Sequence, residues 1–217
     1  MLPPVMDDEQ LKVVIVSDTH GRHRRVEVPD GDLLIHAGDF TAGGRWSDVD
    51  EIDDWLGGFS HDQKIVVAGN CDGCCEGAAD EVRSRLTHAT YLMDEAVEFR
   101  GLTIWGSPWQ PEFMNLAFNL PRGEALAERW AQMPDSVDIL VTHGPPAGIL
   151  DRTSRGERVG DEALRRRADE VSPKLHAFGH VHESSGREDS GDTTFINAAC
   201  NSASDVPAVV YMEMPAD

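Results

Sequence analysis

The chain has 217 residues, of which 40% are hydrophobic, and a formal net charge of -20. This length suits one domain with a sizeable core, so we expect a single domain over residues 1 to 217 with its core from about 11 to 213. The negative charge argues against long nucleic acids and anionic membranes as partners, because both attract basic surfaces.

In chain order, the N-terminal stretch MLPPVMDDEQ has neither the basic nor the apolar region of a secretory signal. No apolar run reaches the roughly 18 residues that a membrane span needs. We therefore expect a cytoplasmic protein. Cysteines at 71, 74, 75 and 200 are not spaced like a disulfide scaffold, and we expect reduced thiols.

Apolar runs predict β-strands that are buried on both faces. They cover Leu11 to Ser17, Leu33 to Ala37, Lys64 to Ala68, Val137 to Thr142 and Lys174 to Phe178. We expect these five strands to build a central sheet. Helical spacing with Gly or Pro near the ends predicts four helices between them. The predicted helices cover Asp48 to Leu56, Glu76 to Leu86, Gly123 to Met133 and Gly160 to Val171.

Other segments alternate in the manner of antiparallel strands. Glu95 to Phe99 and Leu102 to Trp105 flank an Arg-Gly turn and predict a hairpin. Thr193 to Ala198 and Ala208 to Glu213 predict two more strands, whereas His182 to Asp192 is acidic and glycine-rich and predicts an exposed loop. This order predicts an α/β sandwich of two sheets with outer helices.

Polar residues that can bind metal follow the predicted strands. They are Asp18, His20, Asp39, Asn70, His143, His180 and His182. Alternate residues of a strand share a face, so Asp18 and His20 should project into one pocket, as should His180 and His182. Asp39 is placed to bridge two cations. Each motif alone is equally typical of a turn or a helix cap, but the whole set at strand ends predicts a dinuclear metal site.

The order D-x-H, G-D, G-N, a lone H and G-H-x-H resembles the calcineurin-like metallophosphoesterase superfamily over about residues 13 to 200. Several stretches are similar to its MPPED-type branch, the metallophosphoesterase domain-containing phosphodiesterases. They are SDTHGRH (17 to 23), LLIHAGDFT (33 to 41), GSPWQPEFMNLAFNLPRG (106 to 123), THGPPAGILD (142 to 151), LHAFGHVHESSG (175 to 186) and INAAC (196 to 200). The resemblance implies a four-layer α/β/β/α sandwich of mixed sheets, with the metal site at the carboxyl ends of strands.

The resemblance also implies a metal-dependent phosphodiesterase, a phosphoric diester hydrolase, acting on a small phosphodiester or nucleotide such as a cyclic nucleotide. It places one metal on Asp18, His20, Asp39 and His182, and the other on Asp39, Asn70, His143 and His180. Two cations can lower the pKa of a bridging water, and the hydroxide would attack phosphorus in line. Oxygen and imidazole ligands suit Mn, Fe, Co, Ni or Zn. Because members of this family commonly use manganese, the resemblance implies two manganese ions.

One motif departs from the family pattern. The family's asparagine motif continues G-N-H-E/D, and its histidine stabilises or protonates the leaving oxygen, whereas this chain has Cys71 and Asp72 after Asn70. A thiol is a weaker donor than imidazole, so we expect aryl phosphodiesters to be hydrolysed faster than alkyl ones. The candidate catalytic residues are Asp39, Asn70, Cys71, Asp72 and His23.

Alternatives remain at several positions. The same site could serve a phosphomonoesterase, or a weakly active nucleotide-binding regulatory protein. The cluster of Cys71, Cys74 and Cys75 lacks a second cysteine pair, which disfavours structural zinc. His23 could reach substrate phosphate or lie on the surface. Three aromatic residues either wall a base-binding pocket or pack in the core. These aromatic residues are Trp109, Phe113 and Phe118.

Overall fold

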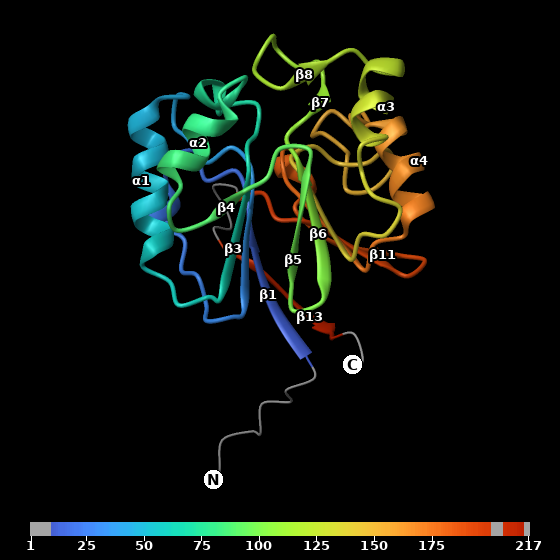
Figure 1. Cartoon of the computed structure of the whole chain (residues 1–217). Helices are drawn as coiled ribbons and strands as arrows, with labels where there is room; N and C mark the ends of the chain where they lie inside the picture. Colours follow the sequence, from blue (N-terminus) through green and yellow to red (C-terminus); the bar gives the residue numbers. More distant parts are fainter. Residues whose placement is uncertain (1–9, 201–205, 215–217) are drawn as a thin grey trace.

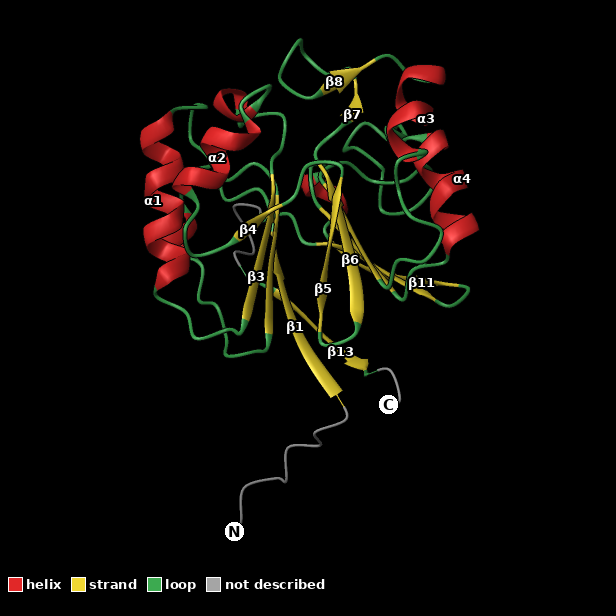
Figure 2. Cartoon of the chain, viewed as in Figure 1, coloured by secondary structure: helices red, strands yellow, loops and turns green. Residues whose placement is uncertain are grey.

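Two β-sheets face each other at the centre of the molecule, and helices cover their outer sides (Figure 1). The computed structural model describes residues 10–200 and 206–214, so the first nine residues of the N-terminal stretch lie outside the described part. Figure 2 shows the helices at the two flanks and the strands between them. The predicted four-layer α/β/β/α sandwich is confirmed.

The first sheet has the strand order β13-β1-β2-β3-β4. Its strands are β13 (Ala208–Glu213), β1 (Gln10–Val16), β2 (Leu33–Ala37), β3 (Gln63–Val67) and β4 (Thr90–Tyr91). β13 pairs antiparallel with β1, and the other pairs are parallel. Helices α1 (Trp46–Gly57) and α2 (Ala79–Arg85) lie on its outer side (Figure 1).

The second sheet has the strand order β11-β12-β10-β9-β6-β5. Its strands are β11 (Gly186–Ser190), β12 (Thr193–Asn197), β10 (Leu175–Phe178), β9 (Ile139–Thr142), β6 (Leu102–Ser107) and β5 (Glu95–Phe99). The two outermost pairs are antiparallel and the inner ones are parallel. Helices α3 (Glu124–Trp130) and α4 (Glu162–Val171) cover its outer side (Figure 1).

Short elements complete the chain. Strands β7 (Gln110–Pro111) and β8 (Asn119–Leu120) form a small separate sheet. Three 3₁₀ turns follow strands of the two main sheets, namely η1 (His23–Arg25), η2 (Gly73–Cys75) and η3 (His182–Ser184). No helix among the described residues is both long and apolar enough to cross a membrane.

Successive side chains of the buried strands point to opposite faces of the sheet and pack into two separate parts of the core. Val14 and Leu34 pack with Ile52 of α1 on the outer side of the first sheet. Their neighbours Val13 and Ile35 pack between the sheets instead. Each such fully buried side chain contributes roughly 1.5–3 kcal/mol of hydrophobic stabilisation. Burial on both faces explains the near-continuous apolar runs, and it fixes the strand ends that carry the polar residues.

Two predictions about the strands are wrong. The five apolar runs do not build one central sheet, since β1, β2 and β3 lie in the first sheet and β9 and β10 in the second. An apolar run predicts that a strand is buried, but it does not predict which strand it pairs with. The segment predicted as an exposed loop contains β11, an edge strand paired with β12. An edge strand can be polar, and here Arg187 forms an ion pair with Asp189 at 2.9 Å.

The remaining predicted elements are confirmed. The hairpin of β5 and β6 forms as expected, and so do β12, β13 and the four helices. Helix α2 begins later than predicted, because Gly73–Cys75 forms a separate 3₁₀ turn before it. The two-residue strand β4 was not predicted, since so short a segment has no measurable periodicity.

Candidate metal centre

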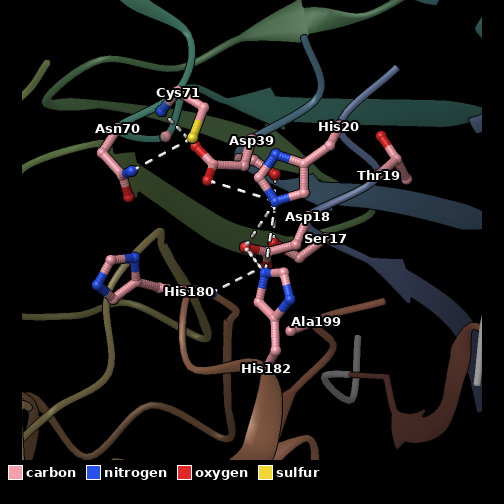
Figure 3. Close-up of polar contacts among 12 residues, drawn as sticks. Ser17, Asp18, Thr19, His20, Asp39, Asn70, Cys71, His180, His182 and Ala199 are labelled. Carbon is pink, nitrogen blue, oxygen red and sulfur yellow. Dashed lines mark hydrogen bonds and ion pairs between the residues drawn. The ribbon is translucent and has the colours of Figure 1, made fainter. Parts of the chain in front are cut away.

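All seven predicted ligands lie in the loops that follow β1, β2, β3, β9 and β10. Figure 3 shows several of them converging on one pocket. The strand-alternation argument for the Asp18 and His20 pair is wrong, because both residues lie beyond β1 in left-handed backbone with φ of 58° and 44°. Left-handed φ is uncommon for residues other than glycine. The turn is held by a hydrogen bond from the His20 N–H to the Asp39 carbonyl at 2.9 Å.

The second histidine pair departs from strand geometry in the same way. His180 has a φ of 67°, and His182 belongs to the 3₁₀ turn η3 rather than to a strand. The His180 N–H donates to Asp18 Oδ2 at 2.9 Å, which joins the loop after β10 to the loop after β1. The two sheets therefore meet at this site through a direct hydrogen bond.

One group of ligands surrounds Asp18. His182 Nε2 lies 3.2 Å from Asp18 Oδ1, and His20 Nε2 lies 4.0 Å from the same oxygen. The two Nε2 atoms are 3.4 Å apart. Burial raises the pKa of Asp18, but the hydrogen bond from His182 and the nearby histidines lower it, and the net shift is downward. Asp18 is therefore a buried carboxylate aimed at two imidazoles.

A second group comprises Asp39, Asn70 and His143. His143 Nδ1 donates to the Ala37 carbonyl at 2.9 Å, which leaves the lone pair of Nε2 for the site. That Nε2 lies 3.0 Å from Asn70 Oδ1 and 3.5 Å from Asp39 Oδ1. With a neutral imidazole all three atoms are acceptors, so either a proton on Nε2 or a cation among them must offset their repulsion.

Asp39 lies between the two groups. Its Oδ2 is 3.8 Å from His20 Nε2, while its Oδ1 faces His143. The two oxygens thus point at different histidines, as expected for a carboxylate that bridges two ions. Burial lowers the pKa of His143, but the charges of Asp39 and Asp18 outweigh it and raise that pKa. The carboxylates thus favour positive charge at His143, although burial lowers the pKa of His20. Ligand atoms of Asp18, Asp39 and His143 lie close enough together to hold a divalent cation.

Glycines before the ligands allow this close approach. A Cβ atom at Gly69 would lie 2.3 Å from Asp39 Oδ1, and one at Gly179 would lie 2.1 Å from Asp18 Oδ2. A Cβ at Gly38 would meet His143 Nδ1 at 2.4 Å. The glycine in each G-D, G-N and G-H motif is therefore required for space, and Gly38 also has a positive φ of 101° that favours glycine.

Cys71 and Asp72 occupy different positions relative to this site. The Cys71 N–H donates to Asp39 Oδ1 at 2.7 Å, and burial raises the pKa of its thiol, which stays protonated. Asp72 is fully buried and accepts from the N–H groups of Thr41 and Gly69, both at 2.8 Å. Asp72 therefore ties the loop after β2 to the loop after β3. It positions Asp39 and Asn70 rather than facing the pocket.

His23 lies apart from the other candidates. It is 1% exposed and packs against Trp55 with ring centroids 5.4 Å apart. It does not line the cavity beside the ligands, so its position does not support contact with substrate phosphate. Cys74 and Cys75 are reduced, with sulfur atoms 3.9 Å apart.

A cavity of about 380 Å³ opens beside the ligands. Of the three aromatic residues singled out in the sequence, only Phe113 lines it, whereas Trp109 and Phe118 are buried against each other. Sequence reasoning missed Val159 and Glu183, which also line it. Val159 belongs to no motif and gave no sequence signal, whereas Glu183 directly follows His182 in the LHAFGHVHESSG stretch but was not singled out.

Comparisons with known proteins point to one family. The family described as Calcineurin-like phosphoesterase matches residues 11–184. Metallophosphoesterase domain-containing protein 1 of Homo sapiens is 44% identical over 87% of this chain, and the chain spans 65% of that relative's length. The Caenorhabditis elegans protein UPF0046 protein K07C11.7 is 39% identical over 97% of the chain and 78% of its own length.

Solved structures share the fold. Phosphopantetheinyl hydrolase from Mycobacterium tuberculosis superposes with a TM-score of 0.58 at 16% sequence identity. The match covers 87% of this chain and 89% of the other. Identity this low supports the shared sandwich architecture alone.

Proposed function

Because the chain belongs to the calcineurin-like phosphoesterase family, we propose that it is a hydrolase with a dinuclear metal site that cleaves a small phosphodiester, such as a cyclic nucleotide. One observation carries the proposal. The two carboxylate oxygens of Asp39 face different histidines, His20 at 3.8 Å and His143 at 3.5 Å. A carboxylate placed in this way supports two adjacent ions better than one.

The ligand assignment follows the two groups. Asp18, His20, Asp39 and His182 would hold one ion, and Asp39, Asn70, His143 and His180 the other. Two bound ions would supply an activated water and two positive charges for the phosphate oxygens. The chain itself fixes the His143 imidazole, because the Ala37 carbonyl accepts from Nδ1 and leaves Nε2 for an ion. Manganese and a cytoplasmic location stay predictions.

The preference for a diester rests on Cys71 and on charge. The protonated thiol is a weak donor, so the site assists poorly in protonating a leaving oxygen. No lysine or arginine is among the residues that line the cavity in the described part of the chain. A diester carries one negative charge where a monoester carries up to two, so the diester needs less compensation. We expect aryl diesters to be hydrolysed at least ten times faster than alkyl diesters.

The test is hydrolysis of bis-p-nitrophenyl phosphate by metal-stripped protein, with Mn, Ni, Zn or Mg added back. Asp39→Ala and His180→Ala should abolish the metal-restored turnover. His88→Ala is the matched control, since His88 is half exposed and pairs with Asp53 away from the ligands. Turnover that survives in Asp39→Ala would contradict the assignment.

Two further outcomes would change the function assigned to the same site. Faster turnover of p-nitrophenyl phosphate than of the diester would indicate a phosphomonoesterase. Nucleotide binding without metal-stimulated turnover of any ester would indicate a regulatory protein. Equal rates for alkyl and aryl diesters would refute the role given to Cys71.

A further inference from the structure

We propose that the cavity beside the metal centre binds a neutral aromatic group of a substrate that carries a single phosphate, with Phe113 as its wall. The inference rests on the proposed function, because the phosphate is placed at the two metal ions. It adds a substrate class that the ligand set does not specify.

The first observation is a cluster of exposed apolar side chains. Phe113, Met114 and Leu116 are 46%, 78% and 40% exposed, although large apolar side chains are usually covered. All three line the cavity beside the metal ligands. An exposed apolar cluster at the rim of a polar site is typical of ligand binding.

The second observation is that hydrogen bonds fix this loop to the site. The Ala117 N–H donates to the carbonyl of Asn70 at 3.2 Å, and the Phe118 N–H donates to Glu76 Oε1 at 2.9 Å. The Asn119 side chain donates to the Phe113 carbonyl at 2.9 Å. The backbone of the loop is therefore fixed beside the site before any ligand arrives, and preorganisation of this kind favours affinity.

The third observation is the shape and lining of the cavity. The Phe113 ring meets the His180 ring edge-on, with centroids 5.3 Å apart and planes at 90°. Val159 and Val181 add apolar surface from other loops. The volume of about 380 Å³ lies at the lower end of small-molecule pockets. A single ring system therefore fits beside a phosphate at the ligands.

Charge limits what this group can be. Apart from the ligands and Cys71, the only ionisable side chain that lines the cavity in the described part of the chain is Glu183. The Ser154 N–H donates to Glu183 Oε1 at 3.1 Å, which holds this carboxyl group at the cavity wall. No cationic side chain offsets it there. A second phosphate or a carboxylate on the bound group would therefore be repelled.

A second cavity lies beside the first and offers a place for the other substituent of a diester. It has a volume of about 520 Å³ and shares Asn70, Cys71 and Leu116 with the first cavity. Its remaining lining includes Gly43 and Gly44 and carries less apolar surface. The two substituents of an acyclic diester would thus lie on opposite sides of Leu116, with the aromatic group beside Phe113.

The test compares phenylphosphonate with methylphosphonate, two non-hydrolysable ligands that differ only in the group beside phosphorus. Isothermal titration of the manganese-loaded full chain should show at least tenfold tighter binding of phenylphosphonate. Phe113→Ala should reduce that ratio below threefold by weakening only phenylphosphonate. Tyr211→Ala removes an aromatic side chain that is 62% exposed on β13 and outside the cavity, and it should keep the ratio.

Contrary outcomes separate the two proposals. Equal affinities in the unaltered protein, or an unchanged ratio in Phe113→Ala, would overturn the aromatic site while leaving the metal site intact. The same holds if 4-carboxyphenylphosphonate binds as tightly as phenylphosphonate. If neither phosphonate needs the metal for binding, the proposed function itself fails.

Discussion

Replacing Gly69 with alanine should weaken metal binding, although Gly69 is not a ligand. The added Cβ would lie 2.3 Å from Asp39 Oδ1 and 2.6 Å from His143 Cε1, where ordinary contacts begin at 3.4 Å. The Cβ would also lie 2.5 Å from the Asp39 backbone nitrogen, so Asp39 as a whole must move by about 1 Å. Gly69 is not in left-handed backbone, so alanine introduces no φ strain and the effect is purely one of space.

The expected magnitude follows from the role of ligand orientation. Displaced ligands or supporting groups typically reduce metal affinity about 10–100-fold, which corresponds to about 1.4–2.7 kcal/mol. Overpacking of a tight site adds a loss of about 1–3 kcal/mol in the stability of the metal-free protein. Both effects are measurable in one variant.

Isothermal titration with Mn²⁺ gives the affinity, and circular dichroism confirms that the variant is folded. Gly43→Ala is the matched control, because a Cβ at Gly43 meets nothing within 4 Å. Gly179→Ala should act like Gly69→Ala, since its Cβ would lie 2.1 Å from Asp18 Oδ2. Unchanged Mn²⁺ affinity in Gly69→Ala would refute the geometry of the centre.

Other expected outcomes concern stability. Burial lowers the pKa of His36 and of His176 to about 3. Both side chains stay neutral in the folded protein but are protonated near pH 6.5 in the unfolded chain. The free energy of unfolding is therefore highest above pH 6.5 and falls as the pH drops toward 3. Each histidine should lower the free energy of unfolding by about 1.4 kcal/mol at pH 5.5, as measured by urea unfolding. A free energy of unfolding that does not change with pH would contradict this. Asp161 caps α4 by accepting from the Leu164 N–H and from Trp130 Nε1, both at 2.7 Å. Asp161→Ala should cost about 2–4 kcal/mol and Asp161→Asn less, and equal melting temperatures would refute the cap. Mn²⁺ at 100 times its Kd should stabilise the protein by about 2.7 kcal/mol, and an unchanged melting temperature on chelation would exclude binding to the folded state.

The sequence predicted the strands and helices closely where burial imposes a pattern. β2 begins and ends at the predicted residues, since every side chain from Leu33 to Ala37 is buried. The sheet assignment failed for β9 and β10, because an apolar run looks the same whichever sheet it joins. β11 was missed because a polar edge strand has the composition of a loop.

The order of motifs predicted candidate ligands that lie near one another in the structure, but it did not predict their local geometry. Asp18, His20, Asp39 and His180 all adopt positive φ, a feature that no periodicity reports. Their conformations depend on hydrogen bonds between loops that are distant in sequence, such as that from His180 to Asp18. Val159 in the cavity wall could not be predicted from the sequence either, because only tertiary packing brings it to the cavity.

The most direct test of the account is the number of Mn²⁺ ions that each chain binds, measured by titration calorimetry and confirmed by elemental analysis of dialysed protein. A dinuclear centre should bind two ions per chain, and fewer than two in Asp39→Ala, because that carboxylate faces both groups of ligands. One ion per chain, or two that persist without the Asp39 carboxylate, would contradict a dinuclear centre bridged by Asp39.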